Sequence, residues 1–303
     1  MSPIDYRKTL TNRIIEQLEA GTAPWIKPWD DRSVLLGQAH NMVTGRPYQG
    51  GNCLWLQCQG YVDPRWCTYK QAKQNGWQVR KGEKAAVVEY WKWGEQKKDE
   101  TDKVVDIKLA APKVFYAHVF NAAQIEGVPE FVPATLDWKL ESAAEHILLA
   151  SGALILHDQS ERAFYSPLRD EIHLPPKQAF VGADRYYSTA LHELGHWSGH
   201  ESRLGRDLSG RFGSEDYARE ELRAELASFF LSSRLGIPHD PGNHAAYVES
   251  WIKALRKDHN EIYRAAKDAE KITEFVLQYQ KQRVASVRPE SVPGQDREEE
   301  LEC

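Results

Sequence analysis

His192-Glu193-Leu194-Gly195-His196 decides the fold of this chain, because these five residues have the H-E-x-x-H spacing of a metal-binding helix. We predict a helix over 186–199. Residues four apart on a helix project from the same face, so both imidazoles can bind one metal ion. Glu193 lies beside them, where it can take a proton from water on the metal. The stretch therefore predicts a catalytic metal site, with His192 and His196 as ligands and Glu193 as the base.

The third protein ligand must come from elsewhere in the chain, since a catalytic site of this kind has three. A metzincin would supply a histidine at position 202, but that residue is Ser202, which excludes the class. We predict a second helix over 215–235, on which Glu221 begins an E-x-x-A pattern that resembles the third-ligand helix of gluzincins. Glu221 is therefore the predicted ligand. Glu225 is the alternative, and whichever of the two is not a ligand can accept a hydrogen bond from a ligand imidazole.

Zinc (Zn²⁺) is the default ion for such a site. Imidazole and carboxylate ligands also suit manganese and cobalt, so Mn²⁺ and Co²⁺ remain alternatives. His200 is in register with His196 but is expected at the rim of the site, because a carboxylate is the better third ligand. The segment 162–176 (RAFYSPLRDEIHLPP) either provides a strand along which an extended peptide substrate lies, or serves only as scaffold.

The composition is that of a folded protein outside the membrane. The 303 residues are 41% apolar and 27% charged, and they are enough for two domains of ordinary size. We find no run of the roughly 18 apolar residues that a spanning helix needs, and the N-terminus MSPIDYRKTL lacks a signal pattern. The four cysteines lack paired C-x-x-C spacing and are too few for a secreted scaffold of this size. We therefore expect a cytoplasmic protein with no membrane partner.

Charge is distributed unevenly along the chain. Residues 1–130 hold 18 Lys and Arg against 15 Asp and Glu, whereas the remainder holds 21 against 29. Net charges of opposite sign in the two segments suggest two modules with different partners, and the basic module would favour a polyanion. Two prolines mark a linker at 126–137. The predicted domains are thus 1–130 and 138–281, followed by a disordered acidic tail over 284–303.

Periodicity predicts a mixed α+β protein. Charged residues at 95–103 (EQKKDETDK) indicate a hairpin tip or a flexible insert, and 41–61 pass from a glycine-rich turn into an apolar run that suits a helix. Together with the two helices that bear the metal site, 186–199 and 215–235, the predicted helices are 5–20, 64–75, 138–151 and 245–281. The predicted strands are 85–93, 112–120, 153–157 and 162–174, the last with a turn inside it.

Aromatic and basic residues alternate in the N-terminal module, which contains seven of the ten tryptophans. Single-stranded nucleic acid is held by rings that stack on bases and by cations that contact phosphates. Each ring alone could equally be a core residue, and each basic cluster a solvated loop. The chain shows no Walker loop and no helicase motif. The candidate DNA-binding residues are Trp25, Lys27, Trp29, Arg46, Trp66, Tyr69, Lys70, Arg80, Lys81 and Lys84.

Several segments together resemble the ArdC-type antirestriction proteins of conjugative plasmids. In the N-terminal module they are DYRKTLTNRIIEQLEAGTAPWIKPW, TGRPYQGGN, GYVDPRW, TYKQA and VRKGEK. In the C-terminal module they are YSPLRDEIHLPP, LHELGHWSGH and YAREELRAELASFFL. These segments span about 1–130 and 140–280, nearly the whole chain, so the resemblance is far more specific than the metal-binding motif alone.

The resemblance implies a mixed α/β domain that binds single-stranded DNA, joined to a zincin-like domain similar to the SprT/Spartan metallopeptidases. It also implies a role in protecting incoming conjugative DNA from host restriction, an inference that composition and spacing alone do not support. The N-terminal module occurs as well in conjugative primases of the TraC kind, although no primase motif is visible here.

The expected function is that of an antirestriction protein that binds single-stranded DNA and carries a zinc metallopeptidase site. Its substrate would be a protein met on DNA, such as a host restriction enzyme subunit. Three alternatives stay open. The protein could coat DNA without catalysis, with the metal only bracing the fold. It could be a protease that acts on DNA–protein crosslinks. It could also be a plain peptidase that binds no DNA.

Overall fold

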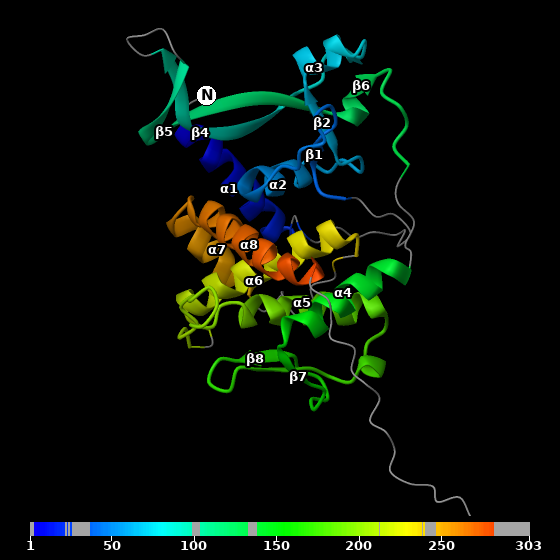
Figure 1. Cartoon of the computed structure of the whole chain (residues 1–303), viewed down its shortest axis with the longest axis vertical. Coiled ribbons are helices and arrows are strands. Elements are labelled where there is room, and N and C mark those ends of the chain that lie inside the picture. The colour runs from blue at the N-terminus through cyan, green and yellow to red at the C-terminus, as the bar shows by residue number, and fades with distance from the viewer. Residues whose placement is uncertain are drawn as a thin grey trace, which may run out of the picture.

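The computed structural model describes residues 3–21, 23, 25, 37–98, 104–132, 138–211, 213–237, 239 and 247–281. Lys27 and Trp29, and the tail expected over 284–303, lie outside the described residues. The elements are stacked in layers along the long axis of the molecule (Figure 1). An N-terminal sheet lies at one end, a small C-terminal sheet lies at the other, and helices fill the space between them. This is the α+β class that the sequence predicts.

A four-stranded sheet organises the N-terminal half, and its two long strands are rich in β-branched and aromatic residues. The first pair in the sheet is parallel and the other two pairs are antiparallel. In spatial order the strands are β1 (His40–Asn41), β2 (Arg65–Thr68), β5 (Val104–Asn121) and β4 (Ala86–Lys98). A separate two-stranded sheet consists of β3 (Gln78–Val79) and β6 (Ile125–Glu126).

Residues 64–75 are not the single helix that the sequence predicts. Their first part is strand β2, where Trp66 pairs with Asn121 of β5, and helix α3 (Tyr69–Gln74) begins only after Thr68. The Thr68 hydroxyl accepts a hydrogen bond from the backbone N–H of Gln71 (3.2 Å), and the Gln71 side chain accepts one from the N–H of Thr68 (2.9 Å). Pairing with β5 occupies the backbone groups that an earlier helix start would need.

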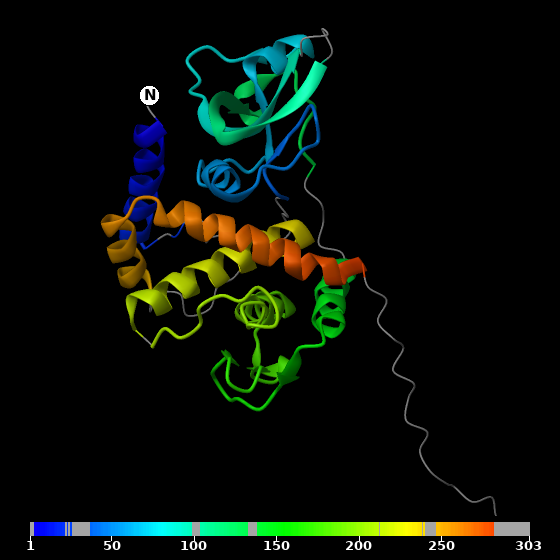
Figure 2. The same cartoon turned by 60° about the vertical axis from the view of Figure 1, so that its left-hand side comes forward.

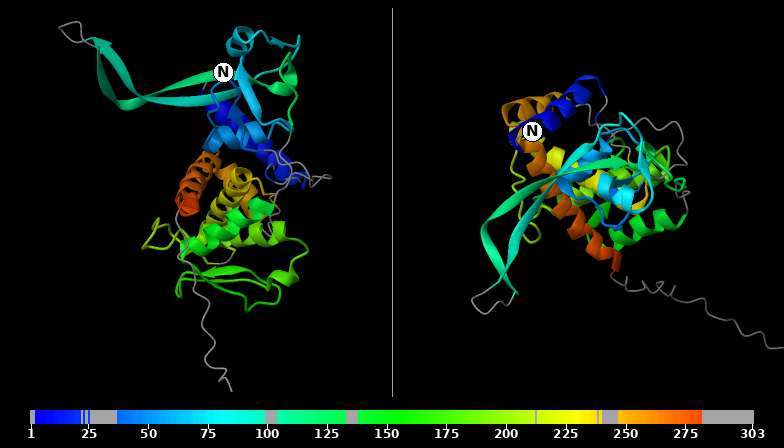
Figure 3. Two further views of the ribbon diagram at one scale, coloured as in Figure 1. Left: turned by 45° about the vertical axis from the view of Figure 1, so that its right-hand side comes forward. Right: turned by 90° about the horizontal axis from the view of Figure 1, so that it is seen from above.

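Strands β4 and β5 are longer than the sequence predicts. Residues 95–98 belong to β4 rather than to a hairpin tip, and pairing with β5 continues past an irregularity between Lys92 and Gly94. The two strands extend from the body as an arm (Figure 3). Both faces of such a ribbon meet water, so its outer half needs no apolar alternation, and periodicity could not reveal it.

The two halves of the chain pack closely against each other (Figure 2). Helix α1 packs on α7, and α2 packs on α8. These helices are α1 (Pro3–Glu19), α2 (Gly50–Gln57), α7 (Val248–Lys257) and α8 (Glu261–Leu277).

Small and apolar side chains make this packing possible. Leu10, Ile14 and Leu18 form the buried stripe of α1. Gly51 allows α2 to approach α8, because a Cβ at this position would lie 2.7 Å from the Tyr263 ring. Buried residues from both halves form one contiguous cluster, so the halves share a core.

The C-terminal half places a helical layer against a small mixed sheet. Strand β9 is central, parallel to β7 and antiparallel to β8, so β8 lies at the edge of the described sheet. The strands are β7 (Leu154–Leu156), β8 (Phe164–Ser166) and β9 (Glu171–His173). The helices are α4 (Trp138–Ser151), α5 (Ala183–Trp197) and α6 (Glu215–Leu235), together with α7 and α8. Short 3-10 helices occur at Ala122–Gln124, Lys177–Ala179 and Gln278–Lys281.

Helices α7 and α8 replace the single helix predicted over 245–281, of which residues 245 and 246 are not described. The Asp258 carboxylate accepts a hydrogen bond from the backbone N–H of Asn260 (2.9 Å), a local bond that competes with helix continuation. Among the described helices, none combines the length and apolar composition needed to cross a lipid bilayer.

Candidate metal centre

Helices α5 and α6 pack face to face and bring the predicted metal ligands together. Gly195 of α5 lies opposite Ala224 of α6, where even a Cβ on Gly195 would be within 3.7 Å of Ala224, so two small residues bring the backbones close. The start of α6 is fixed by Ser214, whose hydroxyl accepts from the N–H of Tyr217 (3.1 Å). Its end is fixed by Gly236 in the left-handed conformation (φ 69°).

Three donor atoms form a small triangle between these helices. The Nε2 atoms of His192 and His196 are 3.2 Å apart. The Glu221 carboxylate oxygens lie 3.6 Å from Nε2 of His192 and 3.5 Å from Nε2 of His196. Donors around a tetrahedral zinc ion, with bonds of about 2.0–2.1 Å, are about 3.4 Å apart. The donor set therefore fits one divalent cation in both chemistry and spacing.

Each ligand imidazole has a second carboxylate at its other nitrogen. Nδ1 of His192 lies 3.4 Å from Oε2 of Glu225, and Nδ1 of His196 lies 3.3 Å from Oε1 of Glu220. A carboxylate in this position favours the proton on Nδ1 and leaves Nε2 free for a metal. Glu225 thus lies where the sequence allowed for it, and Glu220 is an addition that sequence reasoning missed.

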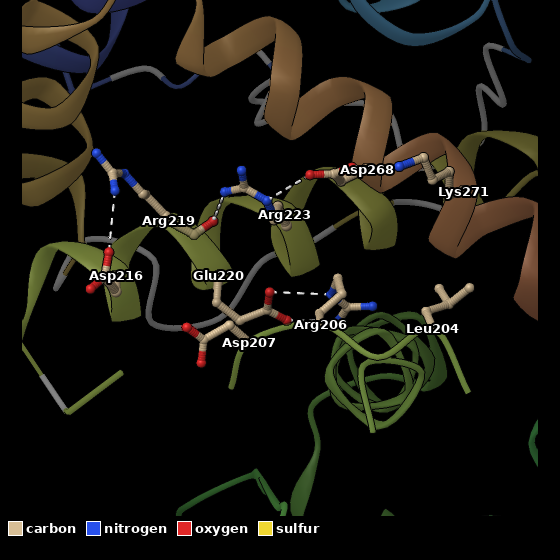
Figure 4. Close-up of a pocket in the computed structure, with 9 residues that line it drawn as sticks. All are labelled: Leu204, Arg206, Asp207, Asp216, Arg219, Glu220, Arg223, Asp268 and Lys271. Carbon is tan, nitrogen blue, oxygen red and sulfur yellow. Dashed lines mark hydrogen bonds and ion pairs between the residues drawn. The ribbon is translucent and has the colours of Figure 1, made fainter. Parts of the chain in front are cut away.

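These two carboxylates are held in turn by residues from loops. Nη2 of Arg206 donates to Oε1 of Glu220 (2.7 Å; Figure 4). The same nitrogen donates to the carbonyl oxygen of Gly195 (2.7 Å). Nε2 of His239 lies 3.4 Å from Oε1 of Glu225. Neither Arg206 nor His239 belongs to a motif, so no signal in the sequence could have identified them.

The charges of the centre shift the pKa values of its members. Burial lowers the pKa of His196, but the Glu221 and Glu220 carboxylates outweigh burial and raise it to about 9. The pKa of His192 is raised in the same way by Glu221 and Glu225. Burial raises the pKa of Glu221, yet the two imidazoles outweigh it and lower that pKa. Without a cation the imidazoles therefore hold protons that a metal must displace.

Glu193 differs from the other acids of the centre. Its side chain is buried, which raises its pKa. Within the described part of the chain, its Oε2 atom is buried and has no hydrogen-bond partner. Burying a carboxylate oxygen without a hydrogen-bond partner costs free energy. Glu193 lines the same cleft as the three ligands, where a water molecule can donate a hydrogen bond to this oxygen.

A cleft of about 990 Å³ opens onto the centre. Phe164 and Tyr165 of edge strand β8 line it, so an exposed strand edge is available to an extended chain. Tyr217 and Tyr247 line it as well, with hydroxyl oxygens 3.3 Å apart, and the Tyr217 hydroxyl also bonds Glu221. Sequence reasoning did not single out these tyrosines.

The candidate DNA-binding residues are scattered over the N-terminal half. Trp25 and Trp66 are 1% and 2% exposed and pack against Trp251 and Tyr61, so they are core residues whose rings a base cannot reach. This corrects the prediction for both. Exposed candidates are Arg46, Tyr69, Lys70, Arg80, Lys81 and Lys84.

Contacts bring some of these candidates near one another. The amide of Asn41, beside the turn that carries Arg46, donates to Gln71 of α3 (3.1 Å), which places Arg46 close to the start of α3 with Tyr69 and Lys70. Arg80 is bound to Glu83 (2.9 Å).

His200, expected at the rim, lies outside the ligand triangle. Its Nδ1 atom is 2.8 Å from the Ser202 hydroxyl.

Known families match both halves. A family model described as the N-terminal domain of the anti-restriction factor ArdC matches residues 4–120. A second, described as a zincin-like metallopeptidase, matches residues 142–268. The zincin-like match and the donor triangle together indicate a divalent metal.

Some relatives of this chain are much longer proteins, and another has a similar length. Two proteins named DNA primase TraC from Escherichia coli are 53% and 51% identical over 292 residues. Each alignment covers 92% of this chain but only 28% and 20% of the primases, so the chain spans less than a third of them. The uncharacterized protein y4eC of Sinorhizobium fredii is 34% identical over 284 residues, covering 91% of this chain and 92% of that protein.

Solved structures agree with the family match. The metal-free crystal structure of the antirestriction protein ArdC from plasmid R388 has a TM-score of 0.70 and 36% identity, covering 90% of this chain and 97% of that one. The Mn(II)-bound structure of the same protein has a TM-score of 0.69 and 37% identity, covering 91% and 98%. Likeness over nearly the full length of both chains confirms the predicted fold class and the resemblance, and the chain belongs to the ArdC antirestriction family.

Proposed function

We propose that this chain binds single-stranded DNA through its N-terminal half, hydrolyses peptide bonds at the metal centre, and protects incoming conjugative DNA from host restriction. The observation that carries the peptidase part is the convergence of two Nε2 atoms and a carboxylate, 3.2–3.6 Å apart, beside the buried Glu193. The N-terminal match to the ArdC domain supports DNA binding. The absence of an apolar spanning helix among the described residues is compatible with the cytoplasm as the site of action.

In this proposal His192, His196 and Glu221 hold the ion. A bound divalent ion of the zinc type lowers the pKa of a coordinated water to about 7 and polarises a carbonyl group. Zinc is the proposed ion, and manganese and cobalt suit the same donors. The Mn(II)-bound relative from plasmid R388 supports manganese as an ion that the site can take.

The chain's own residues perform the proton transfers. Glu193 accepts a proton from the attacking water and later donates it to the leaving amine, a task for which a pKa raised by burial is suited. The Tyr217 hydroxyl, which bonds Glu221 in this structure, is close enough to the donors to support the negative charge that develops on the substrate oxygen. Edge strand β8 holds an extended peptide by backbone pairing.

The substrate that we propose is a protein met on DNA, such as a restriction enzyme subunit. The DNA-binding half and the peptidase half share one core, so a bound strand and the cleft belong to one rigid unit. A second candidate is a non-enzymatic shield. An ion held jointly by α5 and α6 would also brace those helices, and strand coating alone could then provide protection.

Glu193→Gln separates the two candidates, because it removes the base and keeps all three ligands. We expect hydrolysis of an unfolded protein substrate by the Zn²⁺-loaded protein to fall by about 10²–10⁴-fold. Metal content and DNA affinity should stay unchanged, and protection of conjugating DNA should be lost. Glu249→Gln, an exposed acid on α7, is the matched control. Full protection by the Glu193→Gln variant would favour the shield.

A further inference from the structure

Exposed aromatic rings gather on the arm formed by β4 and β5, which extends from the body at the end of the molecule where the N-terminal sheet lies (Figures 1 and 3). Tyr90, Trp91, Trp93 and Phe115 are 53%, 44%, 57% and 38% exposed. Rings of this size are usually buried, and several exposed ones on the two faces of one short ribbon mark an interaction surface. None of the four is among the candidate DNA-binding residues that the sequence suggested.

One face of the arm combines rings with cations. Tyr90 pairs with Phe115 across the two strands, with ring centroids 5.2 Å apart and planes at 16°. Lys92 and Lys113 are the next cross-strand pair on that face, since side chains alternate along a strand. Like charges directly opposite each other are destabilising. Lys113 is paired with Glu95, whereas Lys92 has no acidic partner among the described residues.

The other face of the arm leads into a cavity of about 490 Å³ at the junction of the two halves. Trp91 lines it, its ring lying 5.5 Å from the Arg7 guanidinium, and its Nε1 atom donates to Glu89 (3.3 Å). These contacts fix the orientation of Trp91. Lys8 lines the same cavity and is exposed, so positive charge reaches the body there. Lys257 lines it as well, but it is paired with Glu215 (2.9 Å) and lies beside Asp258.

We propose that the arm is a stacking platform for single-stranded nucleic acid, with bases on its exposed rings and phosphates on Lys92, Lys113 and the cavity rim. The inference rests on the proposed function and assigns the surface that performs its DNA-binding part. Flat rings interleaved with cations suit unstacked bases on a polyanion, whereas a duplex would keep its bases away from the rings. Because the arm belongs to the N-terminal sheet and the metal centre lies between α5 and α6, a strand bound on the arm leaves the cleft open to protein.

The test measures the affinity of the full-length protein for a fluorescent thymidine 20-mer by anisotropy. Trp93→Ala should weaken binding by at least about fivefold, while Trp93→Phe, which keeps a ring, should bind nearly as tightly as the wild type. Lys92→Ala should make the slope of log affinity against log salt shallower by about 0.7, whereas Lys113→Ala should change it less, because Glu95 already partly neutralises Lys113. Leu168→Ala and Lys267→Ala replace exposed residues of the C-terminal half and should change nothing.

The possible results distinguish a failure of the proposed DNA binding from a failure of its assignment to the arm. Failure of the wild type to bind the oligonucleotide would contradict the DNA-binding part of the proposed function itself. Wild-type affinity in the arm variants, with an unchanged salt slope, would overturn only the assignment of the arm. Should the arm variants bind DNA normally but sediment as a smaller species, the occupant of the arm would be a second copy of the chain.

Discussion

Three glutamates within six residues of α6 meet the two imidazoles of α5 in different ways. Glu221 lies toward both Nε2 atoms, whereas Glu220 and Glu225 lie at the Nδ1 atoms. The helical repeat explains the difference, because residues one and four positions from Glu221 project to either side of it. Removing the central carboxylate takes away a proposed ligand, while removing a flanking one only loosens an imidazole.

We therefore expect graded losses of metal affinity. Glu221→Ala should abolish stoichiometric Zn²⁺ binding at micromolar protein, and Glu225→Gln should weaken it by about 10–100-fold. Isothermal titration of the metal-free protein measures both, with Glu274→Gln, an exposed residue of α8, as the control. Equal losses in the two variants would contradict the distinct positions of these carboxylates.

The buried imidazoles should make the metal-free protein less stable as the pH rises. The Glu221 and Glu220 carboxylates outweigh burial and raise the pKa of His196 to about 9, above its usual 6.5. A pKa raised in the folded state adds stability that is complete below about pH 6.5 and is lost as the pH rises through about 9. A bound ion replaces these protons, so the metal-loaded protein should not show this loss.

The measurement is the thermal midpoint of chelator-treated and Zn²⁺-loaded protein between pH 6.5 and 9.5. The metal-free midpoint should fall by at least about 2 °C more than the loaded one. The metal-free His196→Gln variant should lose part of the difference, because His192 keeps its own raised pKa, whereas His200→Gln, outside the donor triangle, should keep all of it. A metal-free midpoint that stays level or rises with pH would refute the assignment of these charges.

At the scale of elements, the close packing of α2 against α8 depends on Gly51, which has no side chain. A Cβ at Gly51 would lie 2.7 Å from the Tyr263 ring, closer than real Cβ contacts allow, so the ring or the helix must move. We expect Gly51→Ala to lower the free energy of unfolding by about 1–3 kcal/mol. Urea denaturation measures it, with Gly37→Ala as the control, because nothing lies within 4 Å of a Cβ there. A neutral Gly51→Ala would show that α2 is free to shift.

Helices that bear the metal centre could be predicted because their signals are local. The H-E-x-x-H spacing and the E-x-x-A pattern lie within single helical turns, so the sequence alone places His192, His196 and Glu221 on matching faces. Arg206, His239 and Tyr247 reach the centre from other segments through long-range packing, which no local pattern encodes. For Trp25 and Trp66 a local pattern misled the prediction. Both lie near basic residues in the sequence, which suggested exposed rings, but long-range packing buries them.

The outer half of the arm escaped prediction for a related reason. Residues 95–98 are polar and charged, so they resemble a loop, yet they pair in register with β5. The break at Asp258 was also hidden, since an apolar helical period continues on both sides of it. The first feature is decided by backbone pairing and the second by a bond from a backbone N–H to the Asp258 carboxylate, and apolar periodicity reports on neither.

On the scale of the whole molecule, the shared core has a consequence for stability. Trp25 of the N-terminal half packs edge-on against Trp251 of α7, with centroids 5.8 Å apart, and the buried cluster continues through both halves. If one half unfolded alone, the apolar side chains that the other half packs against it would become exposed to water. We therefore expect one cooperative unfolding transition. The same coupling should carry stabilisation from the metal centre to the N-terminal half.

Metal binding should therefore raise the unfolding midpoint of both halves together. A ligand that binds only the folded state at 100 times its dissociation constant adds about 2.7 kcal/mol. Tryptophan fluorescence mainly reports the N-terminal half, which holds seven of the ten tryptophans, and far-ultraviolet circular dichroism reports the helices of the other. Both probes should shift equally on addition of Zn²⁺, and neither should shift in Glu221→Ala. A fluorescence transition that ignores the metal while the dichroism transition moves would mean that the halves unfold independently, and the shared core would then not couple the N-terminal half to the metal centre.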